Sequence, residues 1–487
     1  MGIMKRSRFV LAASVWCALF LLPAVGGLTT TVAQTLGAIR TIFVAPVEAG
    51  SYSAAVGKRL AEELQRSGSL RVVSDPAEAD AVLHASGYIW ISGTVSPSVH
   101  SNSTREVNYQ GDLSAELIGR DRQTLWSYMV TPGRFRTASI TDNLADQLVA
   151  RLVAAVRSGI PYPAPYSATA PASSVTIQAA GSTLPAPLYL KWFESYAQAR
   201  AGVTILYDPV GSEAGIERLK DGKVDFAGSD IPVSALPAST ASSILDIPTV
   251  LGAVVPVYNL SSLDGRTLNL TPKALGGIYS GAIRKWNDPL IRESNRGVHL
   301  PDADIDVIHR SDGSGTTYIW TSYLSSISPD WKSRYGAAPT VSWPVGDGVE
   351  GSDGVVEKVS STPNSIGYVE LIYAIQHQVS FAAVRNPAGQ FIKASLESIS
   401  DAVPSSLPTA NDDRSILNAP GRNAYPISAF TWILMPRQSS DAARRQAILQ
   451  FLQWMLTSGQ KECEALGFVP LPRRVAARQL DLLTKLQ

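Results

Sequence analysis

The chain of 487 residues is long enough for two or three domains, since one domain usually takes roughly 100 to 200 residues. Hydrophobic residues make up 45% and charged residues 17%, which argues against a wholly disordered chain and against a polytopic membrane protein. Lys and Arg number 42 against 41 Asp and Glu, a formal net charge of +1. No global field therefore attracts nucleic acid or an anionic membrane, and any bound anion must be captured locally.

Residues 1–33 have the layout of a secretory signal peptide. Basic residues at 5–8 precede an apolar stretch that begins at Phe9 and ends before Pro23. Small residues just before Gln34 offer a cleavage site, which predicts a periplasmic or otherwise extracytoplasmic mature chain. The alternative is an uncleaved membrane anchor, but the most apolar part is shorter than the roughly 20 residues that a span needs.

Residues 35–157 predict a small α/β sandwich, loosely similar to small domains of bacterial envelope proteins. Strands are expected over 41–44, 80–91, 109–118 and 124–130, and a helix over 54–64. A last helix places apolar residues four positions apart for packing on the sheet: Leu144, Leu148, Leu152 and Val156. No catalytic constellation accompanies these elements, so the sequence leaves the role of this envelope domain open.

Residues 158–174 read as a linker, because prolines stand among small polar residues with no apolar period. Beyond it, β-branched runs alternate with helical segments. The runs are at 175–178, 203–207 and 305–308, and the helical segments include 188–199 and 317–324. This alternation predicts α/β layers with mostly parallel sheets.

Three of these strands end in turns rich in glycine and hydroxyl residues, each of which opens a helix. The turns lie at 181–185, 211–215 and 310–317. A helix N-terminus presents N–H groups without internal partners and roughly half a positive charge, so it attracts an oxyanion. Each turn alone is more often a simple helix cap, but the recurrence predicts one shared anion site.

Two charged residues narrow the choice of anion. Arg310 offers a planar fork that fits two oxygens of a tetrahedral anion. Asp230 would repel an anion unless the ligand brings a proton to share. Hydrogen phosphate carries such a proton and sulfate does not, so the pair favours phosphate.

These residues and their flanking motifs resemble the periplasmic phosphate-binding subunit of the high-affinity phosphate ABC transporter. The resemblance runs from about residue 175 to the end and is carried by stretches at 183–187, 191–192, 211–212, 225–230, 285–286, 310–316, 321–324, 343–344, 352–354, 366–370 and 425–427. It implies a two-lobed periplasmic-binding-protein fold, type II-like, preceded by the small α/β sandwich. Lobe I would comprise 175–254 and 425–487, and lobe II would comprise 255–424.

The resemblance also implies the ligand contacts. They fall on Thr183, Leu184 through its backbone, Ser212, Asp230, Arg310, Ser314, Gly315 and Thr316, with Asp312 steadying the arginine. The implied ligand is inorganic phosphate, delivered to the permease and ATPase complex of a phosphate ABC transporter. We expect a monomer with no cofactor, no metal, no catalytic residue and no nucleic-acid partner.

Two positions depart from the family pattern, and two other functions compete with transport. Leu184 replaces a usual aromatic residue, and Glu213 replaces a common serine in the first turn of an anion-binding helix. A secreted phosphatase would need an activated nucleophile or a metal cluster, and the histidines show no ligand spacing. An envelope adaptor or phosphate sensor acting through the N-terminal domain stays open.

Overall fold

The computed structural model describes residues 35–95, 106–130, 140–158, 174–263, 265–404 and 416–486. The predicted signal at 1–33 and all but the two end residues of the predicted linker at 158–174 lie outside these ranges. Across the described ranges, no helix combines the length and the apolar character that crossing a membrane requires.

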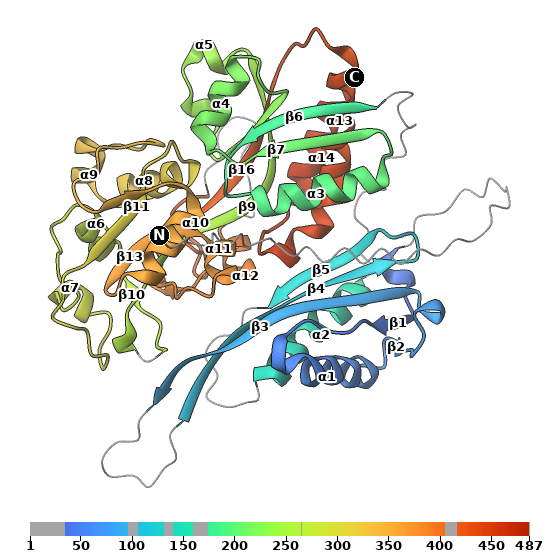
Figure 1. Ribbon diagram of the computed structural model, residues 1–487, viewed down its shortest axis with the longest axis horizontal. Coiled ribbons are helices and arrows are strands. Elements are labelled where there is room, and N and C mark those ends of the chain that lie inside the picture. The colour runs from blue at the N-terminus through green and yellow to red at the C-terminus, as the bar shows by residue number, and fades with distance from the viewer. Residues whose placement is uncertain are drawn as a thin grey trace, which may run out of the picture. The chain divides into compact units, whose positions relative to one another are not determined.

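The N-terminal region is a five-stranded sheet with two helices packed on one face (Figure 1). The strand order is β2-β1-β3-β4-β5. The elements are β1 (Thr41–Val44), α1 (Ser53–Arg66), β2 (Arg71–Val72), β3 (Ala81–Val95), β4 (Glu106–Gly119), β5 (Thr124–Val130) and α2 (Ile140–Ser158). All the predicted strands and helices are present, and β3 and β4 run on beyond their predicted ends because they pair with each other there.

The two helices bury the faces that their apolar spacing predicts. Val56, Leu60 and Leu64 of α1 are fully buried, and the residues of the predicted stripe of α2 are all buried. Between the helices, the Arg59 guanidinium donates to both oxygens of Asp146, with Nε to Oδ1 at 2.7 Å. Apolar packing on the sheet and one bidentate ion pair therefore hold this layer together.

Hydrogen bonds connect this sheet to the C-terminal part of the chain. The Ser114 hydroxyl donates to the carbonyl of Ala465 and the Ser127 hydroxyl to the carbonyl of Lys461, each at 2.6 Å. Lys191 forms an ion pair with Glu116 at 3.6 Å. The N-terminal region thus makes specific contacts in addition to its covalent connection through the linker.

The region after the linker contains an eight-stranded sheet in the order β12-β11-β13-β9-β16-β8-β6-β7. One half consists of β6 (Val175–Gly181), β7 (Val203–Asp208), β8 (Phe226–Ser229) and β16 (Ser428–Pro436). The other half consists of β11 (Asp306–Arg310), β12 (Asp347–Val349) and β13 (Ser365–Glu370). β9 (Ile244–Tyr258) belongs to both halves: it pairs with β16 up to Ala253 and with β13 from Val254 onward.

This change of partner within β9 separates two α/β lobes. Lobe I, which includes β6, carries α3 (Ala186–Ala199), α4 (Ser212–Lys220), α5 (Ala238–Ala241), α13 (Ala442–Thr457) and α14 (Arg473–Thr484). Lobe II, which includes β11, adds a small sheet of β10 (Asn269–Leu270), β14 (Ala383–Arg385) and β15 (Phe391–Ile392). Its helices are α6 (Pro272–Tyr279), α7 (Pro289–Arg292), α8 (Gly315–Ile327), α9 (Pro329–Arg334), α10 (Gly351–Ser361), α11 (Leu371–Gln376) and α12 (Leu396–Ser400).

The outer strands of the large sheet are parallel, as predicted, but its centre is not. β6 runs parallel to β7 and β8, and β11 runs parallel to β12 and β13. β9 and β16 are antiparallel to each other and to their outer neighbours. The reason is topological, because β9 takes the chain out of lobe I and β16 brings it back.

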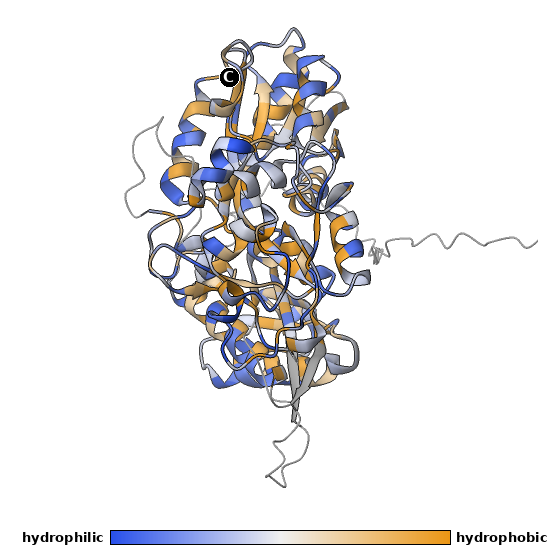
Figure 2. Ribbon diagram, turned by 90° about the vertical axis from the view of Figure 1, so that its left-hand side faces the viewer, coloured by the Kyte–Doolittle hydropathy of each residue, from blue (hydrophilic) through white to orange (hydrophobic). Residues whose placement is uncertain are grey.

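Each lobe has its own aromatic core. In lobe I, Phe193, Phe226 and Phe451 have ring centroids 5.3 to 6.3 Å apart. In lobe II, Trp320 stacks on Tyr368 with centroids 5.0 Å apart. Figure 2 shows apolar and polar residues mixed along the helices of both lobes. Close aromatic packing within each lobe holds the residues on the facing lobe surfaces in defined positions.

Candidate anion site

Four helix N-termini meet where the two lobes face each other. α3 and α4 begin in lobe I, and α8 and α10 begin in lobe II. The first three starts are those that the sequence predicts. The fourth, at Gly351 and Ser352, has the same glycine and hydroxyl pattern but was not among them. Together they direct the positive ends of four helix dipoles toward one region.

Arg310 lies at the centre of this region and is only 3% exposed. Its Nη1 donates to the hydroxyls of Ser352 at 2.9 Å and Thr183 at 3.3 Å, the latter from lobe I. Its Nε and Nη2 donate to the two oxygens of Asp312, with Nε to Oδ1 at 2.7 Å. The predicted arginine and its predicted supporting carboxylate are therefore brought together as a bidentate pair.

Asp312 is fixed from a second direction as well. The N–H of Gly351, at the start of α10, donates to Oδ1 of Asp312 at 3.1 Å. Burial alone would raise the pKa of Asp312, but the hydrogen bond to Arg310 and the charge of Arg310 outweigh burial and hold that pKa below its ordinary value. Asp312 stays ionised and keeps the guanidinium in place.

Asp230 follows β8 in lobe I and is 3% exposed. Its Oδ2 accepts from the Ser182 hydroxyl at 2.5 Å, while Oδ1 is buried and has no partner among the described residues. Burial raises the pKa of Asp230 to about 7, opposed by the Ser182 bond and assisted by the charge of Glu370. A buried carboxylate with one free oxygen suits a ligand that brings its own proton.

The other predicted contacts lie around this pair and are all buried. Ser212 accepts from the N–H of Asp230 at 3.1 Å. Ser314 caps α8 by accepting from the Thr317 N–H at 3.2 Å. The Thr316 hydroxyl donates to Glu370. Every side chain named as a contact on the sequence lies at this junction of the lobes.

Sequence reasoning gave no role to three residues that complete the site. Ser182 fixes Asp230, Ser352 accepts from Arg310, and Glu370 accepts from the hydroxyls of Thr183 and Thr316. Ser352 could have been found as a fourth helix start. Glu370 ends a buried strand, and no local pattern marks a carboxylate at that position.

Leu184 and Glu213, the two positions that depart from the family pattern, both form hydrogen bonds near the site. Leu184 is fully buried, and its N–H donates to the Ser182 hydroxyl at 3.0 Å. Glu213 is half-buried, and its Oε2 accepts from the Thr340 hydroxyl of lobe II at 3.2 Å. Glu213 thus bonds to the facing lobe instead of pointing at Arg310.

Gly315 is a point of close approach between the lobes. A Cβ at this residue would lie 2.2 Å from Ser212 Oγ and 2.3 Å from Asp230 Oδ2, both in lobe I. We therefore expect Gly315→Ala to hinder closure and to weaken anion binding by roughly 5- to 150-fold, since overpacking costs about 1 to 3 kcal/mol. Titration calorimetry with phosphate measures the change.

Gly354→Ala is the matched control for this substitution. Gly354 lies on α10 of the same lobe, and a Cβ there would make only ordinary contact, at 3.6 Å from Val349. The control should bind like the wild type. If Gly315→Ala also binds like the wild type, the lobes do not meet at Gly315 in the bound state.

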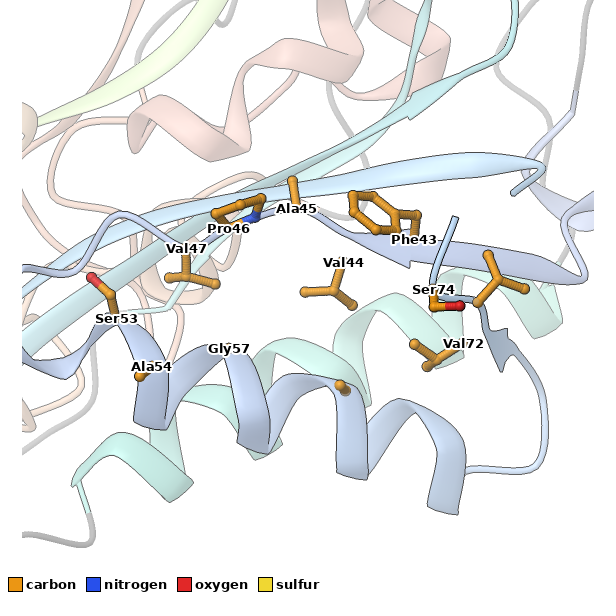
Figure 3. Close-up of a pocket in the computed structure, with 12 residues that line it drawn as sticks. Phe43, Val44, Ala45, Pro46, Val47, Ser53, Ala54, Gly57, Val72 and Ser74 are labelled. Atoms are coloured by element: carbon orange, nitrogen blue, oxygen red, sulfur yellow. The ribbon is translucent and has the colours of Figure 1, made fainter. Parts of the chain in front are cut away.

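A separate pocket of about 470 Å³ lies in the N-terminal region, between α1 and the segment that follows β1 (Figure 3). Its lining includes Phe43, Val47, Ala54, Gly57 and Val72, and no lining residue is ionisable. A cavity of this composition offers an anion no charge. It is not the anion site.

The described residues contain no group of three or more His, Cys, Asp or Glu side chains placed to hold a metal ion. The charges at the lobe junction come from one guanidinium and carboxylates. The chemistry that this arrangement can perform is reversible capture of a tetrahedral, proton-bearing oxyanion.

Two α/β lobes that share the strand β9 and face each other across converging helix N-termini define a periplasmic binding protein. Residues 167–458 match the family described as the PBP superfamily domain. The phosphate-binding protein PstS of Xylella fastidiosa is 41% identical over 312 residues, covering 63% of this chain and 85% of the relative. That of Methanocaldococcus jannaschii is 38% identical over 339 residues, covering 65% and 87%. The chain belongs to the PstS family of phosphate-binding proteins.

The fold has a counterpart among solved structures. The crystal structure of a DING protein matches with a TM-score of 0.50 at 21% identity, covering 62% of this chain and 93% of that one. This likeness shows the two-lobed fold alone. The N-terminal sheet precedes the region that matches the family.

Proposed function

We propose that this protein binds inorganic phosphate between its two lobes and delivers it to the membrane complex of a phosphate ABC transporter. The observation that carries the proposal is the buried Arg310. It forms a bidentate ion pair with Asp312 and donates hydrogen bonds to hydroxyls from both lobes. A desolvated guanidinium among four helix N-termini stabilises a tetrahedral anion strongly. Asp230 opposite it selects an anion that carries a proton.

The contacts that we assign to phosphate are those of the sequence prediction. They are Thr183, Leu184 through its backbone, Ser212, Asp230, Arg310, Ser314, Gly315 and Thr316. To these we add Ser182 and Ser352 as neighbours that fix Asp230 and Arg310. Membership of the PstS family supports the assignment.

We further propose that the protein works outside the cytoplasm as a monomer and has no catalytic activity. The predicted signal at 1–33 and the family support the location. The relatives reported above are named as phosphate-binding proteins, which supports transport over the phosphatase and adaptor alternatives. Residues 35–157 form a domain of their own in this proposal.

Titration calorimetry of the mature chain with phosphate tests the proposal directly. We expect saturable binding of one phosphate per chain, because one arginine and one set of helix starts form one site. Small-angle scattering should show compaction on binding, as expected for lobes that close about a hinge. Absence of any binding heat at millimolar phosphate would overturn the proposal.

A further inference from the structure

The N-terminal domain is attached to lobe I through its strands β4 and β5. The Ser114 hydroxyl donates to the carbonyl of Ala465 at 2.6 Å. The Ser127 hydroxyl donates to the carbonyl of Lys461 at 2.6 Å and accepts from the N–H of Ala465 at 3.2 Å. Both lobe I partners lie between α13 and α14. Because these bonds go to backbone groups of a single short segment, the domain should follow lobe I when the lobes move.

The same domain reaches lobe II at Glu397, in the first turn of α12. The Tyr128 hydroxyl of β5 and the Arg151 guanidinium of α2 both donate to Oε1 of Glu397, the latter at 2.6 Å. Arg151 also lies over the Tyr128 ring, 5.2 Å from its centroid. Burial alone would raise the pKa of Glu397, but its hydrogen bonds and the charge of Arg151 outweigh burial and hold that pKa below its ordinary value. Glu397 is therefore ionised in this contact.

Arg151 also acts on a carboxylate of lobe I. Burial raises the pKa of Glu464 to about 7, while the charge of Arg151 opposes this rise and the charge of Glu397 adds to it. Glu464 and Glu397 come from different lobes, so their negative charges disfavour the approach of the lobes unless a cation offsets them. The N-terminal domain supplies that cation as Arg151.

Met129 of β5 lies where the two lobes adjoin. A Cβ at Gly467 of lobe I would lie 2.9 Å from Cε of Met129 and 3.6 Å from Cδ1 of Ile372, which belongs to α11 of lobe II. Close to Gly467 along the chain, Val469 pairs with Leu251 of β9, near the point where β9 changes its partner. The domain thus contacts both lobes beside a strand that connects them.

These contacts are seen with the lobes closed. In this structure the lobes bond to each other across the anion site, through Arg310 with Thr183 and through Glu213 with Thr340. Rotation of the lobes away from each other would carry Glu397 along with lobe II, while the domain follows lobe I. The contact at Glu397 should then break, because hydrogen bonds weaken steeply once their geometry is lost.

We propose that the N-terminal domain is a clamp on the closed lobes: attached to lobe I, it binds Glu397 of lobe II on closure and so stabilises the phosphate-bound arrangement. The inference rests on the proposed function, because phosphate is what closes the lobes. A contact made only in the closed state adds its free energy to that state, and by linkage phosphate strengthens the contact in return. The envelope domain therefore both favours closure and responds to it.

Titration calorimetry with phosphate at about pH 8 tests the clamp, since Glu464 is then mostly ionised and the charge of Arg151 matters most. Arg151→Gln and Glu397→Gln should each weaken binding by roughly 2- to 10-fold, as expected for a partly exposed, charge-assisted contact. Arg157→Gln is the matched control, because Arg157 is exposed on the same helix and donates to Ser69 of its own domain at 2.9 Å. The control should bind like the wild type.

The double variant decides whether Arg151 and Glu397 act through one contact. It should lose less affinity than the product of the two single losses, because either substitution already breaks the contact. Single losses that multiply in the double variant would show two independent effects and overturn the clamp. Single variants that bind phosphate as tightly as the wild type, or more tightly, would overturn it as well.

Tyr128→Phe covers the case in which the glutamine variants do not fold. This substitution removes one hydroxyl and keeps the buried ring, and it should weaken phosphate binding in the same direction. Wild-type affinity in Tyr128→Phe would count against the clamp. The proposed function fails separately. A wild type that binds no phosphate refutes both, whereas phosphate binding that none of these substitutions weakens refutes only the clamp.

Discussion

Arg310→Ala should weaken phosphate binding by about 30-fold to several thousand-fold, corresponding to roughly 2 to 5 kcal/mol for a buried charge pair. The guanidinium is almost completely buried, and it donates to groups from both lobes. Its removal leaves Asp312, Asp230 and Glu370 without a cation, so the site would repel the anion it should bind. Titration calorimetry with phosphate measures the loss.

Two further variants separate the charge from the geometry. Arg310→Lys should recover only part of the affinity, because an ammonium cannot donate in a fork to Asp312 and still reach the hydroxyls. Arg284→Ala removes an exposed arginine of lobe II and should bind like the wild type. Near-normal binding by Arg310→Ala, with an unchanged melting temperature, would place the anion site elsewhere.

The elements of the fold could be predicted because they depend on local patterns. Apolar residues four positions apart in α2 are the residues buried there, and runs of β-branched residues became β6, β7 and β11. The antiparallel centre of the large sheet could not be read from the same patterns. It depends on which lobe β9 and β16 connect, and strands buried on both faces look alike in either direction.

Part of the site could be predicted because the same kind of turn, rich in glycine and hydroxyl residues, opens several of its helices. Glycine and hydroxyl turns before helices mark Ser212, Ser314 and Thr316, and Arg310 follows from its place at the end of a strand. Glu370 lacks such a mark, because a carboxylate at the end of a buried strand usually points to solvent. Only the packing of both lobes around it places it beside Thr183 and Thr316.

The wild type should ignore sulfate at millimolar concentration near pH 8, whereas Asp230→Asn should bind it measurably. Asp230 is ionised at that pH, and its free oxygen can accept the proton of phosphate. Sulfate would place an unprotonated oxygen against this buried acceptor, losing a hydrogen bond and adding repulsion. Sites of this kind discriminate by about 10⁴-fold or more.

Asparagine removes the charge of Asp230 and can present an N–H to a sulfate oxygen. The variant should keep appreciable phosphate binding, because Arg310 and the helix N-termini are unchanged. Asp246→Asn, on the half-buried Asp246 of β9 in the same lobe, is the control and should leave selectivity unaltered. Competition titrations with sulfate distinguish the three proteins. A wild type that binds sulfate as well as phosphate would show that Asp230 does not select the ligand.

Selectivity should also depend on pH in a direction that the pKa of Asp230 fixes. Burial raises this pKa to about 7, so the carboxylate is ionised above that value and protonated below it. A protonated Asp230 can donate to sulfate as an asparagine would, so sulfate binding by the wild type should appear as pH falls from about 8 to about 5.5. Asp230→Asn has no such group, and its ratio of sulfate to phosphate affinity should change less over the same range. If this ratio depends on pH equally in the two proteins, Asp230 does not determine selectivity.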